Sequence, residues 1–213
     1  MNDIKAWHND VTGAKVVEAL QGNGFEAVYC KSRSEAAAEI LRLIPEPVTV
    51  GLGGSRTIGE LGVVETLKER GNTILDHSAP GLSNEERMQV RRGQLTCGVF
   101  LTGSNAVTMD GRLVNTDGNG NRVAAMIFGP GKVIVVAGIN KVVRDVAEAE
   151  DRIRRVAAPM NNKRLNLPNP CVKTGVCMDC QGPTRICNVT TILNKRPGST
   201  EMHVIIVGEE LGF

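Results

Sequence analysis

The chain has 213 residues, of which 41% are hydrophobic and 23% are charged, and its formal net charge is +2. This mixture is typical of a globular chain long enough to bury a large core, and it excludes disorder as the state of the whole chain. The near balance of charges and an aromatic content of 3% give no indication of binding to nucleic acid or to an acidic membrane surface.

The first ten residues contain no apolar run of the kind found in a secretory signal. No stretch of the sequence approaches the ~18 apolar residues of a membrane-spanning helix. We therefore expect a cytoplasmic protein without a membrane span, in a compartment where thiols stay reduced. The six cysteines then need an explanation other than a disulfide framework.

Strand-like and helix-like segments alternate over the first half of the chain. Strands are predicted at 26–30, 48–52, 73–76 and 99–102, and helices at 32–44, 57–70 and 83–92. Each helix begins with the spacing of a capping box, at Ser32 and Glu35, Thr57 and Glu60, and Ser83 and Glu86. This alternation predicts an α/β fold with a mostly parallel open sheet covered by helices on both faces.

The pattern changes in the second half. Asp110-Gly111 lies between two apolar runs and predicts a hairpin in which both turn residues have positive φ. The run Val133–Ala137 is apolar and β-branched, as in a central parallel strand. An amphipathic helix is predicted at 143–157, ended by Pro159.

After Pro159 the composition shifts, and residues 161–170 are predicted to form a loop. A final apolar strand is predicted at 202–207, returning to the sheet. We therefore expect one domain over residues 1–213, with 160–190 as a cysteine-rich excursion within it.

A glycine-rich turn, Gly51 to Thr57, follows the second predicted strand. Glycines let a ligand approach the backbone, and free amides at the start of a helix attract an anion. The turn fits neither a Walker loop nor a dinucleotide fingerprint. A tight connection with Thr57 as N-cap is the alternative interpretation.

Three further polar segments, 102–105, 117–122 and 140–141, come at or after the ends of predicted strands or in glycine-rich turns on the same side of the sheet. Ligands of open α/β sheets bind beyond the carboxyl ends of the strands, so we favour a pocket over four unrelated turns. The candidate ligand-binding residues are Gly53, Gly54, Ser55, Thr57, Thr102, Gly103, Ser104, Asn105, Asp117, Gly118, Gly120, Asn121 and Lys141. For His77, a structural role is favoured over a place in this pocket.

Together these segments resemble the LUD family of lactate-utilisation proteins. The residues that carry the resemblance are 51–57, 101–107, 110–111 and 121–126. It implies a fold like that of ribose-5-phosphate isomerase and the CoA transferases, whose corresponding turns line a pocket for a phosphorylated or CoA-bearing ligand. The chain lacks the catalytic segments of both enzymes, so neither activity is implied. Family members work with iron–sulfur partner proteins in oxidising lactate to pyruvate.

Four cysteines lie within seventeen residues, at Cys171, Cys177, Cys180 and Cys187. With glycine and proline between them, four thiolates can wrap one metal ion or one cluster. We favour a 4Fe-4S cluster, because the family is associated with electron transfer. Structural zinc and redox-active thiols are the alternatives. Cys30 and Cys97 lie in or beside apolar strands and are predicted to be packed in the core.

Three functions follow from these interpretations. The first is a redox-linked component of organic-acid utilisation that binds a small anionic or phosphorylated ligand and acts with iron–sulfur redox partners. The second is a non-catalytic binding or scaffold subunit with structural zinc, and the third is an isomerase or transferase on the same fold. The sequence leaves the catalytic residues unknown and the oligomeric state open, a homo-oligomer included.

Overall fold

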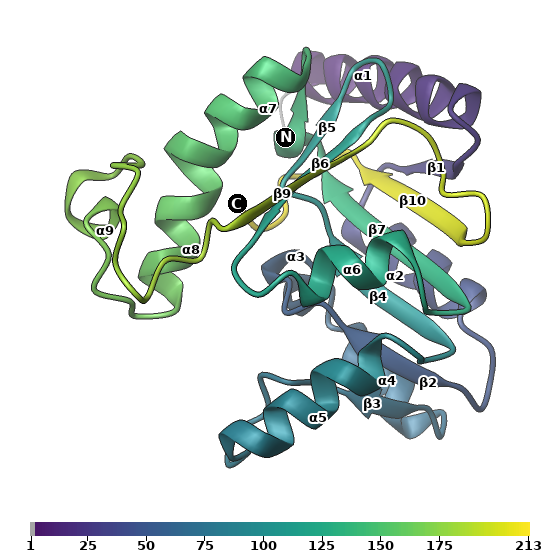
Figure 1. The fold of residues 1–213 in the computed structure, drawn as a ribbon. Coiled ribbons are helices and arrows are strands. Elements are labelled where there is room, and N and C mark those ends of the chain that lie inside the picture. The colour runs from purple at the N-terminus through teal and green to yellow at the C-terminus, as the bar shows by residue number, and fades with distance from the viewer. Residues whose placement is uncertain (1–2) are drawn as a thin grey trace.

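The computed structural model describes residues 3–213 and contains a six-stranded sheet in which all neighbouring strands are parallel (Figure 1). In spatial order its strands are β1 (Glu26–Cys30), β10 (Glu201–Val207), β7 (Lys132–Gly138), β4 (Val99–Gly103), β2 (Thr49–Leu52) and β3 (Thr73–Leu75). The predicted α/β class with a mostly parallel sheet is confirmed.

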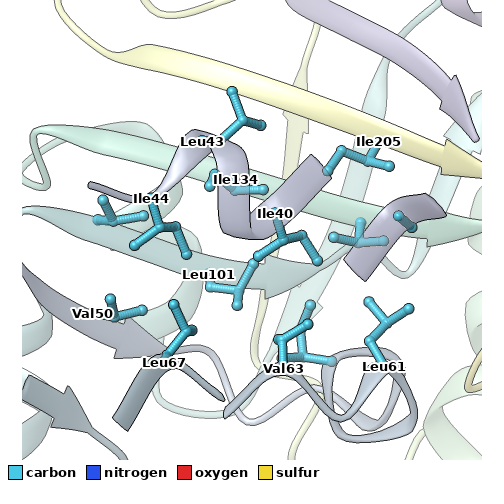
Figure 2. Packing of buried hydrophobic residues seen from close by; sticks show 14 of the residues in the cluster. Ile40, Leu43, Ile44, Val50, Leu61, Val63, Leu67, Leu101, Ile134 and Ile205 are labelled. Atoms are coloured by element: carbon cyan, nitrogen blue, oxygen red, sulfur yellow. The ribbon is translucent and has the colours of Figure 1, made fainter. Parts of the chain in front are cut away.

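Helices cover both faces of this sheet. They are α1 (Asp3–Gly22), α2 (Arg33–Leu43), α3 (Arg56–Leu61), α4 (Val63–Glu69), α5 (Asn84–Gln94) and α6 (Asn121–Ile127). Residues of α2, α3 and α4 pack on one face, where Ile40 and Leu67 are fully buried (Figure 2). Residues of α1 and α6 pack on the other face, and α5 contacts β2 and β3.

Strand β7 shows why the sequence folds this way. Ile134 and Val136 point into the cluster beneath α2 to α4, whereas Val133, Val135 and Ala137 belong to the cluster on the opposite face. A strand covered on both sides has no polar face, so its sequence reads as a continuous apolar run. The prediction of a central strand here is confirmed, and so is the return of the last strand, because β10 lies between β1 and β7.

A second, four-stranded sheet was not predicted. In spatial order it contains β8 (Val142–Val143), β5 (Ala106–Thr108), β6 (Leu113–Asp117) and β9 (Val189–Leu193). The hairpin at Asp110-Gly111 is present, but only Gly111 has a positive φ, of 80°, so the expectation for both residues was wrong. Asp110 instead supports the turn through its side chain, because its carboxylate accepts a hydrogen bond from the Thr108 hydroxyl.

A long helical segment leads from the second sheet to the cysteines. It consists of α7 (Val146–Arg152), the π-helix η2 (Ile153–Ala157) and α8 (Ala158–Arg164), so the prediction that Pro159 ends the helix was wrong. The Ala158 amide donates to the Ile153 carbonyl, five residues back. This wider turn accommodates a proline without an N–H, because π-type spacing shifts the hydrogen-bond register just before it. The predicted loop accordingly begins only after Arg164.

Candidate functional site

A polar cavity of about 520 Å³ lies at the carboxyl ends of β2, β3 and β4. Ten of the predicted ligand-binding residues line it: Gly53, Gly54, Ser55, Gly103, Ser104, Asn105, Asp117, Gly118, Asn121 and Lys141. The four segments therefore meet at one edge of the sheet, although their role in binding stays a prediction.

Three predicted residues do not line the cavity. Thr57 is fully buried behind it, where its hydroxyl accepts from Lys141 Nζ at 2.7 Å and donates to the Leu211 carbonyl at 3.3 Å. Thr102 is buried in β4, and Gly120 is the N-cap of α6 with a φ of 81°. These residues support the walls of the cavity.

The turn after β2 differs in detail from the prediction. Ser55, not Thr57, is the N-cap of α3, and its Oγ accepts from the Ile58 amide at 3.5 Å. Glu60 does not complete a capping box, because its carboxylate accepts from the Gly212 amide at 2.8 Å and from Arg56 Nε at 3.0 Å. Since α3 has only six residues, its helix dipole is small. The turn would therefore favour a ligand more by letting it approach the backbone at the glycines than by the electrostatic field of the helix.

Both glycines of this turn are constrained. A Cβ on Gly53 would lie 2.3 Å from Thr102 Oγ1, and Gly54 has a φ of 68°. A β-branched residue at Gly54 would strain the backbone as well as narrow the cavity, so such a variant does not isolate ligand approach.

The charge of the cavity wall is strongly positive. Six cationic side chains line it, from Arg56, Arg87, Arg91, Arg122, Arg164 and Lys141, against one side-chain carboxylate, from Asp117. Arg87 and Arg91 come from α5 and Arg164 from α8, elements that the sequence analysis did not connect with the pocket. Arg87 and Arg91 are four residues apart in the sequence, and this spacing alone predicts that both lie on the same face of the helix.

Arg122 braces the cavity from α6. Its guanidinium donates to Asn115 Oδ1 at 2.6 Å, to the Thr116 carbonyl at 2.9 Å and to Asn105 Oδ1 at 3.2 Å, and it lies 3.7 Å from the Asp117 carboxylate. Burial lowers its pKa and Asp117 raises it. A buried guanidinium with so many acceptors fixes the β4 and β6 ends relative to each other.

Lys141 is only 4% exposed. Burial, followed by the neighbouring charges of Arg152 and Arg122, lowers its pKa to about 7, whereas Glu60 acts in the opposite direction. Glu60 is itself paired with Arg56. The amine at the base of the cavity is therefore poised to gain or lose its proton near neutral pH, and an anion in the cavity would favour the charged form.

The four predicted metal-ligating cysteines lie beyond α8. Cys171 is buried at the start of α9 (Cys171–Thr174), and Cys177, Cys180 and Cys187 are half-buried in the loop that follows. Figure 1 shows this segment projecting to one side of the main sheet. Cys30 and Cys97 are buried within the core clusters.

The thiols of the loop are close enough to influence one another. Burial, followed by the charge of Cys177, raises the pKa of Cys187 to about 11; Cys171 and Cys180 act in the same direction, and Arg185 opposes them. The Cys187 thiol therefore stays protonated at neutral pH unless a bound metal cation stabilises the thiolate.

Backbone and side-chain contacts hold the cysteine loop in shape. The Asp179 amide donates to Cys177 Sγ at 3.4 Å, as amides do to sulfur ligands of metal centres. Arg185 donates to the carbonyls of Cys180, at 2.6 Å, and Cys187, at 3.1 Å.

The sulfur separations bear on which centre would fit. Tetrahedral zinc with Zn–S bonds of ~2.3 Å holds its sulfurs about 3.8 Å apart. Among the described residues, no three cysteine sulfurs lie within 4.8 Å of one another. A cubane cluster separates its cysteine sulfurs more widely, because each binds a different iron. The donor set of four thiols suits a cluster or a zinc ion.

The cysteine loop and the cavity share a wall. Ile186, next to Cys187, lines the cavity. The Asn188 amide donates to the Asp117 carbonyl, and Asn188 Nδ2 donates to the Gly118 carbonyl, both at 3.0 Å. The residue after the last cysteine is therefore bonded to the Asp-Gly segment of the cavity.

Fold and site together define an α/β protein with a cationic pocket at the carboxyl edge of a parallel sheet and a four-cysteine loop beside it. The model of the LUD domain matches residues 13–207, and the chain belongs to this family.

Solved structures agree with the fold. The chain is similar to a DUF162 family protein from Deinococcus radiodurans, with 14% identity and a TM-score of 0.55, over 93% of this chain and 98% of the other. It is also similar to ribose 5-phosphate isomerase A from Methanocaldococcus jannaschii, with 16% identity and a TM-score of 0.36, over 55% of this chain and 56% of that enzyme. No curated protein matches the chain. In residues 3–213, none of the helices is both long and apolar enough to cross a membrane.

Proposed function

We propose that the protein is a redox-linked component of organic-acid utilisation, of the lactate type, that binds a small anionic or phosphorylated ligand in the cavity and carries a metal centre at the cysteine loop. Membership of the LUD domain family supports a role in lactate utilisation. The cavity and the loop are separate parts of this proposal, and each has its own test.

The observation that carries the ligand proposal is the charge of the cavity. Six cationic side chains against one side-chain carboxylate at a glycine-lined sheet edge favour a ligand with more than one negative charge. Arginines suit carboxylate and phosphate groups because their planar guanidinium donates two parallel hydrogen bonds.

Titration calorimetry with inorganic phosphate and with lactate tests this proposal. Arg91→Met should weaken phosphate binding by about tenfold to a hundredfold, since a hydrogen bond to a charged group contributes roughly 1.5–3 kcal/mol. Arg92→Met is the matched control, because Arg92 is the exposed next residue of the same helix and lies outside the cavity. No binding of either anion, or equal loss in both variants, would contradict an anion site in this cavity.

For the cysteine loop we favour a 4Fe-4S cluster, held by Cys171, Cys177, Cys180 and Cys187. The four-thiol donor set and the hydrogen bond from the Asp179 amide to Cys177 Sγ support it. A bound cluster would supply one-electron transfer, and this loop would exchange electrons with an iron–sulfur partner protein.

Metal and sulfide analysis of anaerobically purified protein tests the cluster. Iron and inorganic sulfide in equal amounts, with visible charge-transfer absorption, are expected. Zinc without iron would replace this proposal with a binding or scaffold subunit that has a structural zinc. Neither metal in anaerobic protein would leave only the ligand proposal, including an isomerase or transferase on this fold.

A further inference from the structure

Gln94 bridges the carboxyl ends of two strands. Its side chain is buried at the end of α5, and Nε2 donates to the Leu52 carbonyl at 2.8 Å and to the Leu75 carbonyl at 2.9 Å. These carbonyls end β2 and β3, where the sheet provides no further partner. The orientation of the amide is fixed by chemistry, because the reverse orientation would place an amide oxygen against two carbonyl oxygens.

This orientation determines the tautomer of His77. Gln94 Nε2 and Oε1 both lie near His77 Nδ1, at 3.0 Å and 3.2 Å. Both N–H groups of Nε2 are used by the two carbonyls, so Oε1 is the group that can pair with the ring nitrogen. Nδ1 must then carry a proton and donate to it. In a neutral ring Nε2 is left as a hydrogen-bond acceptor.

The free nitrogen of His77 faces the cavity. His77 lines the cavity, and Nε2 is its atom nearest to the Cβ position of Gly54, at 3.4 Å. Burial, followed by the charge of Arg91, lowers the pKa of His77, which favours the neutral ring at neutral pH. His77 is also held through its backbone, because Arg87 donates to its carbonyl at 3.3 Å.

A second observation at the same end of the cavity indicates a missing polar partner. Arg91 Nε is buried without a hydrogen-bond partner among the described residues, and Arg91 lines the cavity. Buried polar atoms are almost always satisfied in native proteins, so the guanidinium of Arg91 lacks the internal partners that hold Arg122. This end of the cavity therefore presents a cationic donor and a neutral acceptor side by side.

We propose that His77 Nε2 accepts a hydrogen bond from a hydroxyl group of the ligand, and that the cavity selects small anions that carry a hydroxyl over those that do not. The cationic side chains alone would bind any anion of suitable size. An unprotonated Nε2 distinguishes anions with a hydroxyl group from those without one, because only a hydroxyl can donate a hydrogen bond to it. This inference rests on the proposed anion site and adds the chemical class of its ligand.

The tautomer is tested first, on the unmodified chain. The protein has three histidines, so ¹⁵N-histidine NMR gives three ring systems, and the His77 signals are assigned as those lost in His77→Phe. At neutral pH the His77 ring is expected to be neutral with the proton on Nδ1. A proton on Nε2, or a charged ring, would overturn the inference.

The selectivity is tested with matched probes. Glycerol 3-phosphate is compared with propyl phosphate, and lactate with propionate, because each pair differs in hydroxyl groups alone. The hydroxylated member should bind about tenfold more tightly. In His77→Phe this preference should fall to about one while the affinity for inorganic phosphate is retained.

The outcomes separate the two proposals. Phosphate binding without a hydroxyl preference, or a preference that survives in His77→Phe, overturns the role of His77 and leaves the anion site standing. Absence of binding for every anion overturns both. If His77→Phe fails to fold, Gln94→Met replaces it: the ring then loses its fixed proton on Nδ1, and the hydroxyl preference should weaken.

Discussion

Lys141 and Thr57, 84 residues apart in the sequence, are joined by a hydrogen bond of 2.7 Å from Nζ to Oγ1. The bond connects the 3-10 turn after β7 (η1, Ile139–Lys141) to α3, and so ties two walls of the cavity together. Among residues 3–213, the neutral Thr57 Oγ1 is the one hydrogen-bond acceptor of this buried amine. The cost of keeping the amine charged leads to two predictions.

The first prediction concerns stability. The pKa of Lys141 is about 7 in the folded chain and 10.5 ordinarily, so between these values the unfolded chain binds a proton that the folded chain does not. The contribution of Lys141 to the free energy of unfolding therefore rises with pH between about 7 and 10.5. Lys141→Met should stabilise the protein most at pH 7 and below, and this gain should shrink as the pH approaches 10.5.

Urea unfolding of both proteins at about pH 6 and about pH 9 measures this difference. Lys163→Met, at an exposed position of α8, is the control and should change stability little at either pH. A gain from Lys141→Met that is the same at both values would show that the folded pKa is not lowered.

The second prediction concerns binding. Protonated Lys141 attracts an anion, so the affinity for sulfate, whose charge is constant in this range, should fall as the pH rises through about 7. Calorimetric titration over this range would record the decline. In Lys141→Met the affinity should be lower and nearly independent of pH, since the other wall cations are arginines. An unchanged pH profile in the variant would contradict the role of Lys141.

The third prediction uses two glycines with the same backbone geometry. Gly111 and Gly71 both have a φ of 80°, but a Cβ on Gly111 would lie 2.5 Å from the Ala19 backbone carbon, whereas a Cβ on Gly71 meets nothing within 4 Å. Gly71→Ala should cost about 1–2 kcal/mol, from the left-handed backbone alone. Gly111→Ala should cost at least about 2 kcal/mol more, because α1 must shift. Chemical denaturation compares them, and equal losses would show that α1 yields easily.

The fourth prediction concerns the cysteines. Cys187→Ser should lower the metal content of anaerobic protein and loosen the loop, because loss of one thiolate opens the coordination shell. Cys97→Ser is the control, since this thiol is buried in the core, with the Gln94 and Val99 carbonyl oxygens each 3.1 Å from Sγ as acceptors for its one S–H. Iron and zinc analysis of the two variants is the measurement. Equal metal content in Cys187→Ser and the unmodified chain would contradict the four-cysteine centre.

Much of the main sheet could be predicted, because a strand that is buried on both faces has an uninterrupted apolar sequence. Val133 to Ala137 are apolar without interruption, and Ser32 and Ser83 cap helices as their spacing indicates. The second sheet could not be predicted in the same way. Its strand β9 is mostly exposed and contains Thr190 and Thr191 directly after the cysteine loop, so it lacks the apolar run that reveals a buried strand.

The candidate pocket was only partly predictable. Segments that follow strands, such as Gly53 to Ser55, meet at the sheet edge by topology alone. Arg91 and Arg164 reach the cavity from helices whose packing is not set by any local pattern. His77 lines the cavity, whereas the sequence favoured a structural role for it. Its partner Gln94 lies 17 residues away, and no local pattern reveals that contact.

The position of β10 has a consequence for the order in which the fold can form. Residues 201–207 pair with 26–30 on one side and with 132–138 on the other, so β1 has no sheet partner until the final strand arrives. Loops of well over a hundred residues must close to bring β1 and β10 together, which slows folding and leaves the apolar edge of β7 uncovered meanwhile. During synthesis this edge would stay open to pairing with other chains until residues 201–207 have emerged, which makes β7 a site of risk for aggregation.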